Sequence, residues 1–442
     1  MTNKNNILLI TFLREFMTNS LIIDKFRSKD TDFTRNRKLP FWKTTILILR
    51  SWKTPIHSKL IKFFGSLNLL NVMPTASAFC QARKKINPEL FIALKYETVT
   101  FFYKNYEKSG LVKRWNGRLL WAIDGTSINI PDTQETRNKY SIQVNQYNKD
   151  GTVQALSSFL YDVLNEICIN VVFNGTKCEK NSIFDEHIKH FNKEAINIYD
   201  RLYADYSVLS FHVKEDVDYV IRCRLTQSFK EVIDFVKSDR IDKIVNLKVT
   251  EGQKKFVKEN RLPEEITVRL VKVKLNNGNI EVLITSLLNR ERYNYKDFKW
   301  LYNKRWGIET YFNRLKNLLE IERFSSETMI GIEQDFYGLI FLSTFESVLT
   351  KEDEEELSKQ NIENKLKYEY KINKSVSYSA LAEHIAELLL ETNVPPLEIL
   401  DKLSIIFKTG SSPQRPGRQF KRKIATPSQK LRFHKYGKRV LA

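Results

Sequence analysis

Four residues of one short segment have the types and spacing of a binding edge for a charged substrate: Tyr302, Arg305, Glu309 and Lys316. On a helix that turns by about 100° per residue, these side chains share an arc of about 60°. An adjacent stripe is apolar and contains Leu301, Ile308, Phe312, Leu315 and Leu319. The spacing predicts a continuous helix with one buried face and a polar edge about 21 Å long. Such an edge suits a long, charged substrate better than a small metabolite.

A second interpretation gives the same segment no function. Arg305 and Glu309 stand at positions i and i+4. An exposed ion pair at this spacing stabilises a helix by only about 0.3–0.5 kcal/mol. The segment alone leaves both interpretations open, and the rest of the chain decides between them.

Two further carboxylates come from strand-like segments. Asp124 follows the apolar run "RLLWAI", and Asp200 ends the short run "INIYD". Carboxylates at the ends of neighbouring strands converge, and with Glu309 they would repel one another unless a cation lies between them. Oxygen ligands suit Mg²⁺ or Mn²⁺. A pair of such ions about 3.5–4 Å apart can activate an attacking hydroxyl and stabilise the leaving oxygen in phosphoryl displacement. We therefore expect Asp124, Asp200 and Glu309 to be metal-binding, catalytic residues.

The charge of the whole chain agrees with a polyanionic substrate. The 442 residues include 72 Lys and Arg against 52 Asp and Glu, a net charge of +20. A charge of this size favours nucleic acid as a partner. Arg305 and Lys316 would then hold phosphates beside the metals, and Tyr302 would hydrogen-bond a phosphate or stack on a base.

Other features narrow the class of protein. The cysteines (Cys80, Cys168, Cys178 and Cys223) are scattered and form no CxxC pair, which indicates a reducing compartment. They form no metal-like cluster with the six histidines, which argues against a structural zinc site. No segment is apolar for the length that a membrane span needs, and the short apolar run after "MTNKNN" is interpreted as the start of a helix.

Residues 1–112 are predicted to be helical and to form an N-terminal DNA-binding domain. A helix, a break at Met73-Pro74 and a second helix capped by Thr75 or Ser77 resemble a helix–turn–helix. The second helix ends in the basic run "RKK", residues 83–85. A plain helical hairpin with a solvated basic end is the alternative.

The remaining chain is predicted to hold a mixed α/β core interrupted by a β-rich insertion. Four regions follow the N-terminal domain: a first part of the core (113–225), the insertion (226–290), a second part of the core with the Tyr302 segment (291–345), and a helical C-terminal region (346–442). The last 32 residues, 411–442, contain ten Lys or Arg and no acid, which predicts a flexible tail that holds nucleic acid loosely.

These motifs resemble the DDE transposases of the insertion sequence four family. The spacing Tyr-x2-Arg-x3-Glu-x6-Lys is that family's YREK signature. "IDGT" (123–126) resembles its first-Asp motif, "YDRLY" (199–203) its second-Asp motif, and "SAFCQARKKI" its N-terminal domain. The resemblance covers about residues 75–325.

The resemblance implies a fold, a reaction and a setting. The core would be RNase H-like, with Asp124, Asp200 and Glu309 binding two divalent metals and Tyr302, Arg305 and Lys316 holding the transposon end. The reaction would be hydrolytic nicking at the ends of the element, followed by attack of the freed 3′-hydroxyl on target DNA. The protein would act as a homodimer on double-stranded DNA in the prokaryotic cytoplasm, near the nucleoid.

Three positions near these motifs carry further expectations. Leu202 replaces a family glycine and would be strained if the position required a positive φ. Asp205 is a fallback metal ligand. Trp306 would support the helix or act as a wedge at a distorted DNA end, and we favour support.

Two other functions fit the same residues. One is a metal-dependent RNase H-like nuclease that never joins strands. The other is a catalytically inactive protein that binds transposon ends; the retained acids argue against it, and Leu202 argues for it.

Overall fold

The computed structural model describes residues 3–35, 37–50, 55–145, 148–174, 179–275, 277–390 and 394–415. The described residues fall into two compact units. Unit 1 comprises Met1–Val112, Ile128–Ala155 and Leu315–Ala442, and unit 2 comprises Lys113–Ser127 and Leu156–Arg314. The division of the chain into five regions stays a prediction.

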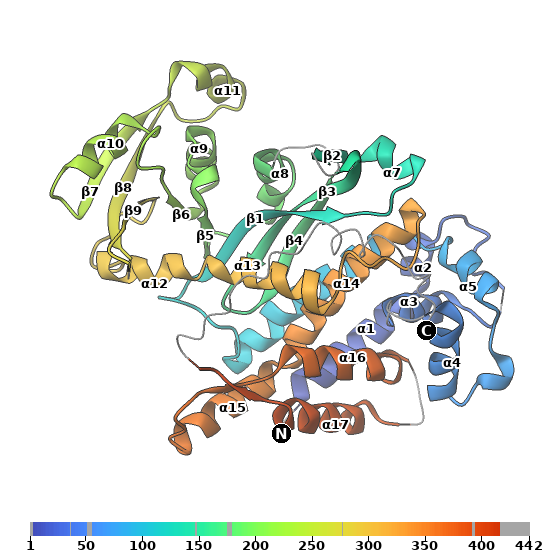
Figure 1. The fold of residues 1–442 in the computed structure, drawn as a ribbon. Coiled ribbons are helices and arrows are strands. Elements are labelled where there is room, and N and C mark those ends of the chain that lie inside the picture. Colours follow the sequence, from blue (N-terminus) through green and yellow to red (C-terminus); the bar gives the residue numbers. More distant parts are fainter. Residues whose placement is uncertain are drawn as a thin grey trace. The chain divides into compact units, whose positions relative to one another are not determined.

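Unit 2 is built on a mixed β-sheet, whose strands run in the order β4-β3-β1-β5-β6-β9-β8-β7 (Figure 1). The strands are β1 (Leu119–Asn129, of which residues 128–129 belong to unit 1), β3 (Asn148–Asp162, of which residues 148–155 belong to unit 1), β4 (Ile167–Asn174), β5 (Ala195–Tyr199), β6 (Asp218–Arg222), β7 (Asp242–Lys248), β8 (Glu265–Lys274) and β9 (Ile280–Thr285). Strands β3 and β4 are antiparallel, whereas β1, β5 and β6 are mutually parallel. This arrangement confirms the predicted mixed α/β core.

The parallel strands form because their sequences suit burial on both faces. Residues 119–123 of β1 and all of β5 are buried, as is typical of central parallel strands. The β-rich segment extends this sheet, since β9 pairs with β6 and is followed by β8 and β7.

The helices of unit 2 differ in part from the prediction. They are α8 (Glu179–Asp185), α9 (Tyr206–Glu215), α10 (Lys230–Lys237), α11 (Lys254–Glu259), α12 (Phe298–Asn303) and α13 (Trp306–Asn313), with short 3₁₀ turns η4 (His187–His190), η5 (Arg201–Tyr203), η6 (Glu251–Gln253) and η7 (Tyr295–Asp297). The continuous helix predicted from residue 302 is divided between α12 and α13. Strand β1 also continues past Asp124 to Asn129, so the expectation that Asp124 ends its strand is wrong.

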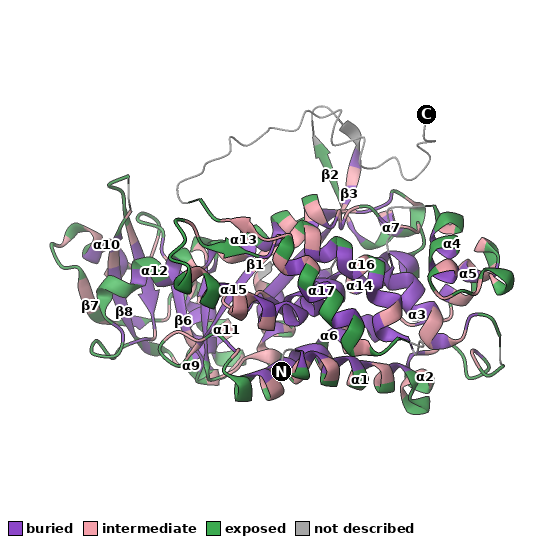
Figure 2. Ribbon diagram, turned by 90° about the horizontal axis from the view of Figure 1, so that it is seen from below, coloured by how far each residue is buried: buried purple, intermediate pink, exposed green. Residues whose placement is uncertain are grey.

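Unit 1 is mainly helical. Its elements are α1 (Lys4–Thr18), α2 (Ser20–Phe26), α3 (Phe41–Leu49), α4 (Ile56–Ser66), η1 (Leu70–Val72), α5 (Ala76–Arg83), α6 (Glu89–Phe101), η2 (Phe102–Tyr106), η3 (Glu107–Ser109), α7 (Gln134–Lys139), β2 (Ser141–Asn145), η8 (Arg314–Leu318, of which Arg314 belongs to unit 2), α14 (Met329–Leu349), α15 (Lys351–Glu363), β10 (Tyr370–Lys371), α16 (Lys374–Leu389), α17 (Pro396–Thr409) and β11 (Ser412–Pro413). Helix α14 is buried over almost its whole length and packs against α6 and α3 (Figure 2).

The predicted break at Met73-Pro74 is confirmed. Helix α4 and the turn η1 precede it, and α5 begins after Thr75, whose hydroxyl accepts a hydrogen bond from the Ala78 N–H at 3.1 Å. Residues 416–442, which make up most of the predicted basic tail, and Cys178 lie outside the described residues.

Among the described helices, none alone has the length and apolar character needed to cross a membrane; α1 and α2 pass that test only as a pair bent by 62°.

Candidate functional site

The strand register brings two of the predicted acids to one level of the sheet. Strands β1 and β5 pair in parallel from Leu119↔Ala195 to Ala122↔Ile198. Asp124 and Asp200 each stand two residues beyond the last of these pairs, at the carboxyl side of neighbouring strands. Both side chains are partly exposed. The structure thus brings Asp124 and Asp200 to the same level of two neighbouring strands, although 76 positions separate them in the sequence.

The third acid, Glu309, lies on a segment that is not one continuous helix. Helix α12 ends at Asn303 and α13 begins at Trp306. Between them the backbone bonds to the third preceding residue, as in the Arg305 N–H that donates to the Tyr302 carbonyl at 3.0 Å. The prediction of a single helix from residue 302 to 316 is therefore wrong. Lys316 lies in the π-helical turn η8 of unit 1, and its predicted place beside the acids stays a prediction.

Helix α13 is fixed to the sheet by aromatic packing. The Tyr311 ring stacks on Tyr161 with centroids 4.3 Å apart, and Phe312 meets Phe159 edge-on at 5.2 Å. Gly307 permits a close approach, because a Cβ there would lie 3.2 Å from the Cβ of Val163. These contacts set the position of Glu309 on the adjoining face.

Arg305 connects two of the acids. Its Nη2 donates to Glu309 at 2.7 Å, and its Nη1 lies 3.6 Å from the Asp124 carboxylate. The residue is 3% exposed, so the interpretation of an ordinary surface ion pair is wrong. Burial alone would lower the pKa of the Arg305 guanidinium, but the surrounding groups, among them Glu309 and Asp124, raise it above its ordinary value. Asp124 and Glu309 therefore share one permanent cation.

Two aromatic residues lie against the Arg305 guanidinium. Its carbon is 4.6 Å from the centre of the Trp306 ring and 5.9 Å from that of Tyr302. Trp306 is 49% exposed and so both supports Arg305 and presents ring surface to solvent. Tyr302 is 5% exposed and belongs to the core under the sheet, so its ring offers little surface for stacking on a base.

The Tyr302 hydroxyl is a buried donor. Among the described residues it has no hydrogen-bond partner. Burial raises the pKa of the Tyr302 hydroxyl, which therefore stays protonated. Its contact with DNA stays a prediction.

The surroundings of Asp200 correct two expectations. The Asp200 carboxylate accepts the Leu202 N–H at 2.6 Å, and Leu202 has a negative φ, so leucine is not strained here. Asp205 caps α9, accepting the Ser207 N–H at 3.1 Å, and lies 3.2 Å from Lys180. These contacts give Asp205 a structural role in place of the fallback metal role.

The donor set fits a divalent cation in chemistry and charge. Asp124, Asp200 and Glu309 provide oxygen ligands only, and Arg305 compensates one of their three charges. Among the described residues, no group of three or more His, Cys, Asp or Glu has a metal-binding arrangement. The assignment of these acids as metal ligands therefore stays a prediction.

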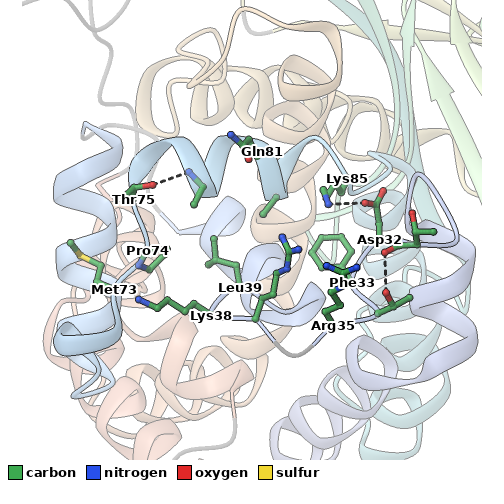
Figure 3. Close-up of a pocket in the computed structure, with 15 residues that line it drawn as sticks. Asp32, Phe33, Arg35, Lys38, Leu39, Met73, Pro74, Thr75, Gln81 and Lys85 are labelled. Atoms are coloured by element: carbon green, nitrogen blue, oxygen red, sulfur yellow. Dashed lines mark hydrogen bonds and ion pairs between the residues drawn. The ribbon is translucent and has the colours of Figure 1, made fainter.

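Unit 1 has a separate basic cavity of about 890 Å³ between the loop after α2 and helix α5 (Figure 3). Arg35, Arg37 and Lys38 line it and are exposed. Asp32 is the acid in its lining and pairs with Lys85 at 2.8 Å. The acid-free run "TRNRKL" in the sequence was a signal for this basic surface, which the prediction missed.

The predicted basic end of the second helix is only partly available for binding. The Arg83 guanidinium is 5% exposed and donates to Asp335 at 2.7 Å, Gln334 at 2.7 Å and Ser325 at 2.7 Å. Arg83 therefore holds α5 to α14 within unit 1, and it is Lys84 that stays exposed.

The sequence was compared with a family model and with a curated relative, and the structure with solved structures. Residues 115–345 match the family described as the transposase DDE domain. The chain is 23% identical over 339 residues to the transposase InsG for insertion sequence element IS4 of Escherichia coli (strain K12), covering 75% of this chain and 74% of that protein. It is also similar to a solved piggyBac transposase synaptic complex with hairpin DNA, with 11% identity, a TM-score of 0.44, and coverage of 95% of this chain and 88% of that chain.

Proposed function

The chain belongs to the transposase DDE domain family and is a DNA transposase, and we propose that it cleaves DNA at the ends of a mobile element and joins the freed 3′-hydroxyl to target DNA. The observation that carries this proposal is the sharing of Arg305 by Asp124 and Glu309. In the proposed site, three acids from distant parts of the chain would act together on one phosphodiester, as metal-assisted phosphoryl transfer requires.

In this proposal Asp124, Asp200 and Glu309 hold two divalent metal ions, Mg²⁺ or Mn²⁺. Bound there, the ions would activate the attacking oxygen and stabilise the leaving one. The protein's own contribution is to present Asp124 and Asp200 from neighbouring strands of the sheet and Glu309 from helix α13. Arg305, shared by Asp124 and Glu309, compensates one of the three negative charges until the substrate arrives.

DNA would be held by cations in both units. Arg305 and Lys316 would contact phosphates of the transposon end, and the Tyr302 hydroxyl would donate to one. The basic cavity of unit 1 is suited to the DNA backbone, because three exposed cations line it. A homodimer would bring two transposon ends together.

A strand-transfer assay tests this proposal against its nearest alternative. Pre-cleaved duplexes carrying the inverted repeats that flank the reading frame are incubated with target plasmid and Mg²⁺. We expect joined products that disappear in Asp124→Asn. Nicking without joining would identify a nuclease, and binding without either reaction would identify an inactive end-binding protein.

A further inference from the structure

Arg222 continues the row formed by the two acids. Strands β5 and β6 pair in parallel from Ile196↔Asp218 to Tyr199↔Ile221. The next residues on the two strands are Asp200 and Arg222. Asp124, Asp200 and Arg222 thus stand at one level on three neighbouring parallel strands, β1, β5 and β6.

The Arg222 guanidinium is held on one side only. Its Nη1 donates to Glu281 on β9 at 2.7 Å, and its side chain is 23% exposed. Among the described residues, Nε has no hydrogen-bond partner and Nη2 donates to none. Burial lowers the pKa of Arg222, but its surroundings, including Glu281 and Asp200, raise it overall, so the group stays charged.

A purely structural ion pair explains this arrangement poorly. Strands β6 and β9 are already joined through their backbones, with Arg222 opposite Leu283. A buried Nε without a partner costs free energy, on the order of 1–3 kcal/mol for a donor left unsatisfied. Arginine recognises phosphate through planar donors held in a fixed direction, and Nη2 of Arg222, which donates to none of the described residues, is such a donor.

We propose that Arg222 is a phosphate-binding residue of the active site and that Glu281 orients its guanidinium toward the DNA strand lying over Asp200. This inference rests on the proposed function. Arg305 is paired with Asp124 and Glu309, so it does not supply a cation beside Asp200. Arg222 would supply that cation.

Three variants test the inference in the full-length protein: Arg222→Ala, Arg222→Lys and Glu281→Gln. Binding to a duplex carrying the terminal inverted repeat is measured by fluorescence anisotropy across a salt series. We expect Arg222→Ala to weaken binding about tenfold and to lower the salt slope by about one unit, because one phosphate contact is lost. Arg222→Lys should recover the slope, since it keeps the charge.

Glu281→Gln is the matched control for the ion pair. It removes the partner of Arg222 without removing the cation, so end binding should be unchanged or tighter. If Arg222→Ala and Glu281→Gln lower the melting temperature equally and both keep the wild-type salt slope, the pair is structural and the inference is wrong. If the wild-type protein neither binds nor nicks the duplex, the proposed function itself fails.

Discussion

The Arg305 guanidinium donates to the Glu309 carboxylate at 2.7 Å in a position where Arg305 is 3% exposed. The same guanidinium lies 3.6 Å from Asp124. A buried cation is stable only while an acid compensates its charge, because an uncompensated buried charge is costly. Arg305 therefore acts as the internal counter-ion of the site when no metal is bound.

Glu309→Gln should abolish cleavage and leave binding to transposon ends nearly unchanged. The substitution keeps the shape of the side chain but removes a charged metal ligand, while the cations that hold DNA remain. We expect the single-turnover rate to fall on the order of a thousandfold or more, as when catalytic groups are removed. Nicking at the wild-type rate in Mg²⁺ would show that Glu309 binds no metal.

Arg305→Met should destabilise the metal-free protein and increase its response to metal. Without the guanidinium, Asp124 and Glu309 repel each other, and we expect a loss of about 1–3 kcal/mol because both acids are partly solvated. Added Mn²⁺ should then raise the melting temperature more than in the wild type. Arg305→Lys is the control, and an equal response to Mn²⁺ in all three proteins would exclude the counter-ion role.

The strands that carry Asp124 and Asp200 could be predicted because their apolar runs are short, continuous and rich in residues that favour sheets. The cap at Thr75 could be predicted because capping depends on local residue types. Both features are decided within a few residues of the chain.

Other parts of the site depend on distant contacts. The burial of Arg83 depends on Gln334 and Asp335, about 250 positions away. The helix break before Trp306 occurs without proline, among residues that tolerate a continuous helix. The pairing of Arg222 with Glu281 requires β9 to join the core sheet beside β6, and no local pattern specifies that order.

Gly307→Ala should lower activity with little effect on stability. The new methyl group would lie 3.2 Å from the Cβ of Val163, so α13 must shift by a few tenths of an ångström and move Glu309. Alanine also favours the helix by about 1 kcal/mol, which offsets the crowding. We expect the cleavage rate to fall about tenfold, since catalysis is sensitive to small displacements.

Val163→Gly supplies the matching test of this contact. Combined with Gly307→Ala it removes the two crowded side-chain atoms of Val163, Cβ and Cγ1, and the cleavage rate should return toward the wild-type value. If the double variant is no faster than Gly307→Ala alone, the close approach of α13 to Val163 does not position Glu309.

The basic cavity of unit 1 should contribute to DNA affinity without affecting chemistry. Replacing Arg35 and Lys38 together with alanine should lower the salt slope of end binding by about two units. The cleavage rate at saturating DNA should stay the same. Lys371 and Lys402, which are exposed elsewhere on unit 1, provide a control pair of equal charge; an equal loss in both double variants would show only a general effect of net charge.

Unit 2 should lose stability as the pH falls from about 6.5 to about 4. The first value is the ordinary pKa of histidine, and the second is the pKa of His212 in the folded protein. Burial lowers this pKa, and the neutral ring donates from Nδ1 to the Val208 carbonyl while Nε2 accepts from the Tyr199 hydroxyl at 2.9 Å. The unfolded chain binds a proton in this range that the folded chain does not, so the loss reaches at most about 3 kcal/mol. His212→Phe should flatten this dependence.

The contact between α15 and α17 in unit 1 should respond in the opposite direction. Burial raises the pKa of Asp353 to about 6, and its carboxyl group bonds Ser404 on α17. The folded chain therefore gains a proton first, and because protonation removes the cost of burying the charge, the folded state of unit 1 becomes more stable as the pH falls from about 6 to the ordinary value of 3.8. Hydrogen exchange can be measured by mass spectrometry at several pH values across this range, with each rate divided by the intrinsic rate at that pH. As the pH falls, this relative exchange rate should rise in α9 and fall in α17. Asp353→Asn should remove only the second effect, and parallel changes in both helices would contradict the assignment of these two groups.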